Sequence, residues 1–210
     1  MKQYRNLDEL RIMYDAKRSA IRTRLKEYRA IHTNKYFYEL LYCLMTPQSS
    51  AVNAAKAQTL FEALDFEHND VDVESILRRK EHYIRFHRSK ARWIATMKVQ
   101  YHAIVDVTTG NLSAIEKREW LVKNVLGLSY KEATHFLRNI GKNDGLTILD
   151  RHIFTNLKYY GIIRTIPKSL SKKNYLSVER KFQKFAQYVN ITADELDLLF
   201  WSKQTGEILK

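Results

Sequence analysis

Apolar residues recur every three or four positions along most of the chain, which is the spacing of helices that bury one side. Six glycines and two prolines in 210 residues are few, and this favours long helices over a turn-rich β protein. One segment, Tyr36–Met45, is apolar nearly all round, as expected of a central buried helix. The pattern predicts an all-α protein, with further helices at residues 7–29, 113–125, 129–140, 175–185 and 193–201.

Local capping sequences predict where several of these helices start. In a capping box, an N-terminal Ser, Thr or Asn and a Glu three residues later each bind a backbone N–H group of the first turn. Such boxes begin at Asn6, Ser113, Ser129 and Thr192. Asp150 also precedes a predicted helix, where its carboxylate would cap the first turn. These five positions are therefore the expected N-termini of helices.

The most informative stretch is residues 122–163, in which a tight turn at Gly127–Ser129 leads into a helix, a loop and a second helix. The first of these helices has one apolar stripe, and Lys131, His135 and Arg138 fall on a different face. The stripe consists of Ala133, Phe136, Leu137 and Ile140.

Two side chains in this stretch form a predicted reactive pair. Lys131 lies in the first turn of its helix, where the positive end of the helix dipole disfavours an ammonium ion and partial burial favours the neutral amine. A neutral lysine amine is a Schiff-base nucleophile. Asp150 lies at the next helix start, where capping holds and orients its carboxylate. The turn at Gly127–Ser129, followed by free helix N–H groups, also predicts an anion site.

The formal net charge is +13, from 36 basic and 23 acidic residues. This surplus indicates a polyanionic partner such as nucleic acid, although a ribosome-associated or merely soluble basic protein has the same composition. Basic residues exceed acidic ones by nine to four in residues 1–29, by eight to one in 78–98 and by seven to one in 164–184. Aromatic residues interleave the middle run, which suits base stacking and phosphate pairing as well as a buried stripe.

Cys43 is the one cysteine, which excludes a disulfide framework and a four-cysteine metal or iron–sulfur site. Its apolar neighbours predict a small buried side chain. No apolar run has the length of a membrane helix, and no secretory signal is present. We expect an intracellular protein of the cytoplasm or nucleoid.

Residues 127–131, 131–139 and 148–152 resemble the helix-hairpin-helix–Gly/Pro–Asp superfamily of DNA glycosylases. They most resemble its archaeal-type (type 2) 8-oxoguanine DNA glycosylase/AP lyase branch. In that family the hairpin binds DNA phosphates, a lysine attacks the sugar, and an aspartate closes the motif.

By this resemblance, Lys131 and Asp150 are the catalytic residues, and Gly127 and Ser129 contact the DNA backbone. Ser129 departs from the family pattern, because the hairpin usually has a second glycine there. The serine is compatible with a helix start, although it places a side chain where the backbone would approach a phosphate.

Other segments resemble the substrate-binding parts of the same family. Residues 44–51 match a segment beside the damaged base, so Gln48 either contacts a base edge, fills the gap left by flipping, or is simply a turn residue. Residues 83–87 resemble the family segment whose phenylalanine stacks on the extruded base, and this resemblance implies that role for Phe86. Helical spacing alone favours a core position for Phe86. At the C-terminus, Trp201 would stack opposite Phe86, and the terminal carboxylate of Lys210 would recognise oxidised guanine; without the resemblance they read as core and frayed tail.

The sequence thus predicts one glycosylase unit over residues 1–210, with two helical subdomains flanking a cleft and a helix-hairpin-helix region at about 114–161. The hairpin and Asp150 would line one wall of the cleft. The implied activity is excision of 8-oxoguanine through a lysine Schiff base, followed by β-elimination. The expected partner is double-stranded DNA with 8-oxoguanine or abasic sites, bound by a monomer without metal or cofactor. The alternatives are a non-enzymatic helix-hairpin-helix DNA-binding protein and a glycosylase for another oxidised base.

Overall fold

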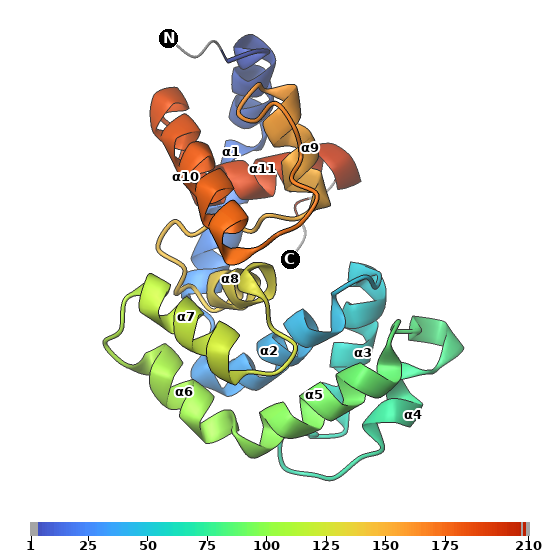
Figure 1. The fold of residues 1–210 in the computed structure, drawn as a ribbon. Coiled ribbons are helices and arrows are strands. Elements are labelled where there is room, and N and C mark those ends of the chain that lie inside the picture. The colour runs from blue at the N-terminus through green and yellow to red at the C-terminus, as the bar shows by residue number, and fades with distance from the viewer. Residues whose placement is uncertain (1–3, 207, 209–210) are drawn as a thin grey trace. The chain divides into compact units, whose positions relative to one another are not determined.

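The computed structural model describes residues 4–206 and 208, and every regular element in this part of the chain is helical (Figure 1). The all-α prediction is therefore confirmed. In chain order the helices are α1 (Leu7–Arg29), η1 (Thr33–Lys35), α2 (Tyr36–Met45), α3 (Ala51–Ala63), α4 (Val73–Leu77), η2 (Lys80–His82), α5 (His87–Val99), α6 (Tyr101–Thr109), α7 (Ala114–Asn124), α8 (Tyr130–Asn139), α9 (Arg151–Tyr159), α10 (Lys172–Val189) and α11 (Ala193–Thr205).

The helices form two compact units, as the predicted pair of subdomains requires. Unit 1 consists of Met1–Ala30 and Asn143–Lys210, and unit 2 consists of Ile31–Lys142. Lys131 thus belongs to unit 2 and Asp150 to unit 1, which differs from the prediction that the hairpin and Asp150 lie on one wall. The cleft itself stays a prediction.

The core of unit 2 is built on α2. All ten residues of Tyr36–Met45 are buried, including the predicted small side chain of Cys43. Helices α3, α5 and α8 all pack against α2. A helix surrounded in this way has no solvent-facing side, and this explains why its sequence is apolar except for Glu39, which accepts a hydrogen bond from Asn139 of α8.

Unit 1 is organised by α11, against which α1, α9 and α10 pack. The predicted apolar side of α1 is buried at Leu10, Tyr14, Ile21 and Leu25. Buried Glu195 on α11 joins the two helices, because it accepts a hydrogen bond from the Tyr14 hydroxyl at 2.9 Å and from Arg22 Nε at 2.8 Å.

Three of the four predicted capping boxes are present, at Ser113, Ser129 and Thr192. The box predicted at Asn6 is wrong. Asn6 has φ 56° and no capping side-chain hydrogen bond, although α1 does begin at Leu7. Its partner Glu9 instead accepts hydrogen bonds from Lys203 Nζ and from the Tyr159 hydroxyl. Long-range partners have replaced the local one.

Burial on α8 extends beyond the single predicted stripe. His135 and Arg138, on the other face, are also buried, and Lys131 is the one residue of α8 that is left half-buried. The physical reason is that α8 is enclosed by α2 on one side and α7 on another. Across the part of the chain with described coordinates, no helix is both long enough and apolar enough to span a membrane.

Candidate active site

The helix-hairpin-helix consists of α7, a tight turn and α8, which lie side by side in unit 2 (Figure 1). Gly127 in the turn has φ 91°, a conformation that favours glycine. A Cβ atom at this position would lie 2.5 Å from the Trp93 ring of α5. The turn therefore needs glycine both for its backbone angle and for the close approach of an aromatic ring.

Ser129 and Glu132 close the start of α8. The Ser129 backbone N–H donates to Glu132 Oε2 at 3.3 Å, and the Ser129 hydroxyl donates to the same oxygen. The predicted return of Glu132 to the helix start is therefore confirmed. Backbone N–H groups of a first helical turn, together with the helix dipole, favour an anion at this end of α8.

Lys131 lies in this first turn with 20% of its side chain exposed. Its Nζ atom is 3.5 Å from Glu132 Oε1, so Glu132 contacts both the cap and the lysine. Sequence reasoning treated Glu132 only as a capping residue. A partly exposed amine can be reached by a substrate, and a nucleophilic lysine requires such access.

Asp150 caps α9 as predicted, and both of its carboxylate oxygens are used. Oδ1 accepts from the backbone N–H of Ile153 at 2.8 Å, and Oδ2 accepts from the indole Nε1 of Trp201 at 3.1 Å. Trp201 is half-buried, and the His152 ring packs edge-on against it with centroids 5.9 Å apart. Two residues predicted separately are thus in direct contact within unit 1.

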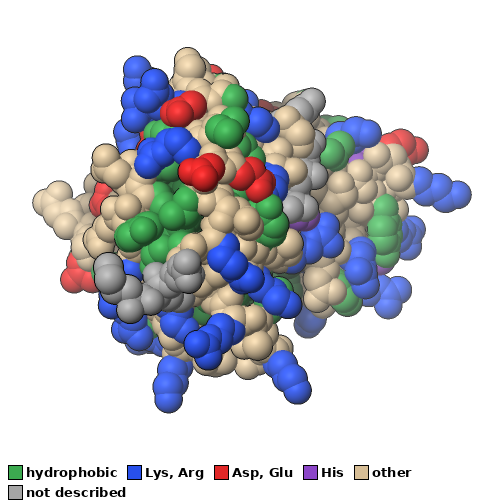
Figure 2. Space-filling view, turned by 90° about the horizontal axis from the view of Figure 1, so that it is seen from above, with side chains coloured by type: hydrophobic (Ala, Val, Ile, Leu, Met, Phe, Trp, Pro, Cys, Tyr) green, Lys and Arg blue, Asp and Glu red, His purple; other side chains and the backbone are tan. Residues whose placement is uncertain are grey.

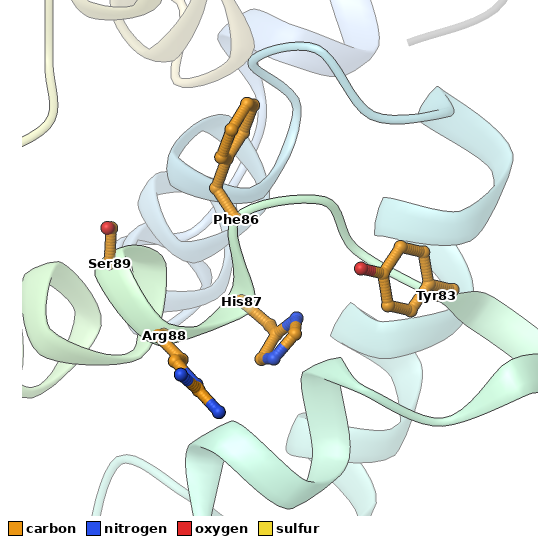
Figure 3. Close-up of a pocket in the computed structure, with 5 residues that line it drawn as sticks. All are labelled: Tyr83, Phe86, His87, Arg88 and Ser89. Carbon is orange, nitrogen blue, oxygen red and sulfur yellow. The ribbon is translucent and has the colours of Figure 1, made fainter.

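Helical spacing alone favours a core position for Phe86, but the structure places this residue at the surface. It lies just before α5 with 52% of its surface exposed and φ 58°. Figure 3 shows its ring pointing away from His87, which turns towards Tyr83. These residues, with Arg88 and Ser89, line a small open pocket. An exposed phenylalanine is available for stacking, and the guanidinium of Arg85 lies 5.4 Å from its ring centroid.

Gln48 lies in the turn between α2 and α3, exposed to solvent and with φ 54°. The Ser49 N–H closes this turn by donating to the Thr46 carbonyl at 3.0 Å. Its turn position is confirmed, and its contact with a base stays a prediction. Lys210 lies outside the described residues.

Sequence reasoning missed Lys90, which is 1% exposed. Of the eight basic residues in 78–98, a stretch described throughout, it is the one that is buried. Its spacing from Ile94 and Met97, four and seven residues on, places it on their buried stripe, and this was the available signal.

Lys and Arg side chains are scattered over the face shown in Figure 2, where Asp and Glu side chains are fewer. All seven basic residues of 164–184 are exposed. Their exposure is consistent with contact to DNA phosphates and equally with a face that is simply solvated. Among the described residues, no group of three or more His, Cys, Asp or Glu side chains could hold a metal ion.

An all-helical fold, a glycine-dependent hairpin and exposed basic flanks define a helix-hairpin-helix DNA-binding protein. The family model described as "8-oxoguanine DNA glycosylase" matches residues 21–191. The chain therefore belongs to the 8-oxoguanine DNA glycosylase family.

Curated relatives and solved structures agree with this placement. The chain is 37% identical over its whole length, and over the whole of the relative, to an 8-oxoguanine DNA glycosylase/AP lyase of Fusobacterium nucleatum. It is similar to the crystal structure of the Thermotoga maritima 8-oxoguanine DNA glycosylase, with a TM-score of 0.85 and 30% identity over 97% of this chain and 98% of that one. It is also similar to the Methanocaldococcus jannaschii 8-oxoguanine glycosylase/lyase in complex with 15mer DNA containing 8-oxoguanine (TM-score 0.86, 30% identity, 97% and 99% covered).

Proposed function

We propose that this protein removes 8-oxoguanine from double-stranded DNA and then cuts the strand at the resulting abasic site. Family membership supports the reaction class. The structural observation that carries the proposal is the position of Lys131, half-buried in the first turn of α8 and directly after the glycine-dependent turn. A hairpin that binds the phosphate backbone would bring this amine to a deoxyribose.

DNA binding would rest on the hairpin and on the basic surface. Backbone N–H groups around Gly127 and Ser129 would contact phosphates, because the first turn of α8 presents donors and a positive dipole end there. The exposed cations of 164–184 would add sequence-independent attraction. These contacts would fix the register of the duplex without reading its sequence.

The damaged nucleotide would be flipped out of the helix, because its sugar carbon cannot be attacked within the stack. Phe86 and Trp201 would stack on the extruded base, and Gln48 would contact a base edge or fill the gap in the duplex. The terminal carboxylate of Lys210 would recognise the oxidised guanine. The exposure of Phe86 and Gln48 supports their availability for these roles.

In the chemical step, Lys131 Nζ would attack the sugar C1′, forming a C–N bond as the glycosidic C–N bond breaks and the base leaves. Asp150 would stabilise the positive charge that develops on the sugar and help to ready the amine. Opening of the sugar ring would give an imine, which acidifies the C2′ proton. Loss of that proton and of the 3′ oxygen would then cut the strand by β-elimination. Lysine chemistry of this kind uses neither metal nor cofactor.

Borohydride trapping tests this proposal. We expect the wild-type protein to form a covalent adduct with a duplex containing a single 8-oxoguanine, because borohydride reduces the imine to a stable amine. Lys131→Ala should form none, while Lys56→Ala, at an exposed site on α3, serves as a control for loss of one cation and should form the adduct normally. Absence of an adduct with wild type, or an undiminished adduct with Lys131→Ala, would contradict the mechanism.

The same experiment on other lesions tests the substrate. Faster trapping on a duplex with an oxidised pyrimidine would show that the lysine chemistry is right and the substrate assignment wrong. Binding without any cleavage would identify a non-enzymatic DNA-binding protein. We further propose that the protein acts as an intracellular monomer, which sedimentation with and without DNA would test.

A further inference from the structure

The buried amine of Lys90 is fully hydrogen-bonded to the turn that carries Gln48. Its Nζ atom donates to the carbonyl oxygens of Met45 at 2.6 Å and Pro47 at 2.7 Å, and to Ser49 Oγ at 3.0 Å. An ammonium group has three donors, so all of them are used inside the protein. Two of the three acceptors belong to the residues on either side of Gln48.

The same residue is joined to Phe86. The backbone N–H of Lys90 donates to the Phe86 carbonyl at 3.0 Å, in the first turn of α5. Ser49 Oγ, which accepts from Lys90, also accepts from the backbone N–H of Arg85 at 2.9 Å. Lys90 therefore connects the two segments that present Gln48 and Phe86 to solvent.

Both presented residues have backbone angles that need support. Gln48 has φ 54° and Phe86 has φ 58°, values in the left-handed region that cost a non-glycine residue on the order of 1 kcal/mol or more. Such conformations persist where the surrounding structure fixes them. The Nζ bonds to the neighbours of Gln48 supply that constraint on one side, and Ser49 Oγ passes it on to the Phe86 segment by accepting from the Arg85 N–H. The backbone N–H bond to the Phe86 carbonyl is present whatever side chain stands at position 90.

An amine at this position is costly to the fold. Burial lowers the pKa of Lys90 to about 8, while the Glu132 carboxylate partly opposes this shift and the Lys131 and Arg85 cations add to it. An apolar side chain would fill the same space without the desolvation cost, so what the amine adds at this position is its three hydrogen bonds.

We propose that Lys90 is a positioning residue for lesion recognition, holding Gln48 and Phe86 in one fixed arrangement without contacting DNA itself. This rests on the proposed function, in which those two residues bind the flipped base. Strand cleavage at a preformed abasic site has no base to recognise. Lys90 should therefore matter for base excision and much less for abasic-site cleavage.

The test compares the two reactions under single-turnover conditions. Lys90→Met keeps the approximate length of the side chain and removes the three Nζ donors, while the backbone N–H bond to Phe86 is retained. We expect a loss on the order of 100-fold in the rate of 8-oxoguanine excision, the scale of a misplacement of about 1 Å, with abasic-site cleavage within about threefold of wild type. Lys56→Met is the matched control and should leave both rates unchanged. An equal loss in both reactions would overturn the proposal and would indicate an effect on Lys131 instead.

Non-additivity provides a second readout. In a Gln48→Ala/Phe86→Ala background, Lys90→Met should slow excision by no more than about threefold, because the groups that it positions are already gone. A further 100-fold loss would show that Lys90 acts by another route.

If Lys90→Met does not fold, a second variant tests the same idea. Ser49→Ala removes one acceptor of the Lys90 amine and should give a smaller loss with the same selectivity for excision. A loss without selectivity would overturn the proposal. Wild type that excises no base refutes the proposed function, whereas active wild type with an unselective Lys90→Met refutes this inference alone.

Discussion

Asp150 uses both carboxylate oxygens at once, and this restricts what it can do. One oxygen holds the first turn of α9 and the other holds the indole of Trp201. The carboxylate is therefore fixed in direction by a backbone donor and a side-chain donor, as a group that must face a developing charge should be. The stacking surface of Trp201 is fixed by the same contact. In the proposed mechanism, this one hydrogen bond in unit 1 would join a residue of the chemical step to a residue that binds the base.

Replacement of Asp150 by Asn separates charge from geometry. Asp150→Asn should retain DNA affinity within a fewfold but slow excision by about 10² to 10⁴-fold, because the neutral amide cannot stabilise a cation or assist the amine. Equilibrium binding and single-turnover excision measure the two effects. Trp201→Phe is the matched control, since it removes the indole donor and keeps the carboxylate and an aromatic ring, and it should cost much less. Loss of binding with an unchanged rate on bound DNA would contradict the role given to Asp150.

Helix α8 illustrates how packing decides the character of an element. Its sequence has one apolar stripe, yet nearly every side chain is buried because α2 and α7 cover it. The start of the helix is the part left accessible, and there Ser129, Glu132 and Lys131 lie together. The turn before it is locked by contact of Gly127 with Trp93, so α5 supports the hairpin through an aromatic ring.

Gly127→Ala should destabilise the protein by about 2 to 4 kcal/mol, since it combines a left-handed backbone angle with a clash against Trp93. Gly145→Ala is the matched control: its φ is +78°, but no described atom lies within 4 Å of the added Cβ. It should cost only about 1 kcal/mol. Urea denaturation measures both variants. Equal destabilisation would show that the backbone angle alone requires glycine at 127. Gly127→Ala should also weaken DNA binding more than Gly145→Ala does.

Over the whole molecule, charge is the property that both units share. The net charge is +13, and exposed cations occur in unit 2 at residues 78–98 and in unit 1 at 164–184. Each phosphate contact releases condensed counterions, so a surface of this kind binds DNA with an affinity that falls steeply with salt. Such attraction depends little on sequence, which suits a protein that must inspect any stretch of duplex.

We expect the dissociation constant for duplex DNA to rise by on the order of 10³-fold or more between 50 and 200 mM salt, the range given by six to ten phosphate contacts. Replacing Lys181 and Lys184 of α10 by Gln should lower the slope of log K against log salt by about one for each side chain that contacts a phosphate. An unchanged slope would assign this face of α10 to solvent. Fluorescence anisotropy with a labelled duplex measures both quantities.

The sequence by itself determined the all-helical class, the central buried helix and the starts of several helices, because these depend on residues a few positions apart. It identified the hairpin through its resemblance to a known family. Ser113, Thr192 and Asp150 each cap a helix by accepting a hydrogen bond from a backbone N–H three residues away. The apolar composition of Tyr36–Met45 is sufficient to predict that this helix is buried. The local rule failed at Asn6, where Glu9 found distant partners instead.

Only the tertiary structure decided the contacts between distant segments. Trp201 meets Asp150 across 51 positions, and Lys90 reaches the turn of Gln48 across more than 40. In sequence, Lys90 is one cation in a basic run, and Phe86 is one apolar residue in a helical pattern. Burial of the first and exposure of the second depend on how α2 and α5 pack, because side-chain environment is set by neighbours in space and not by spacing along the chain.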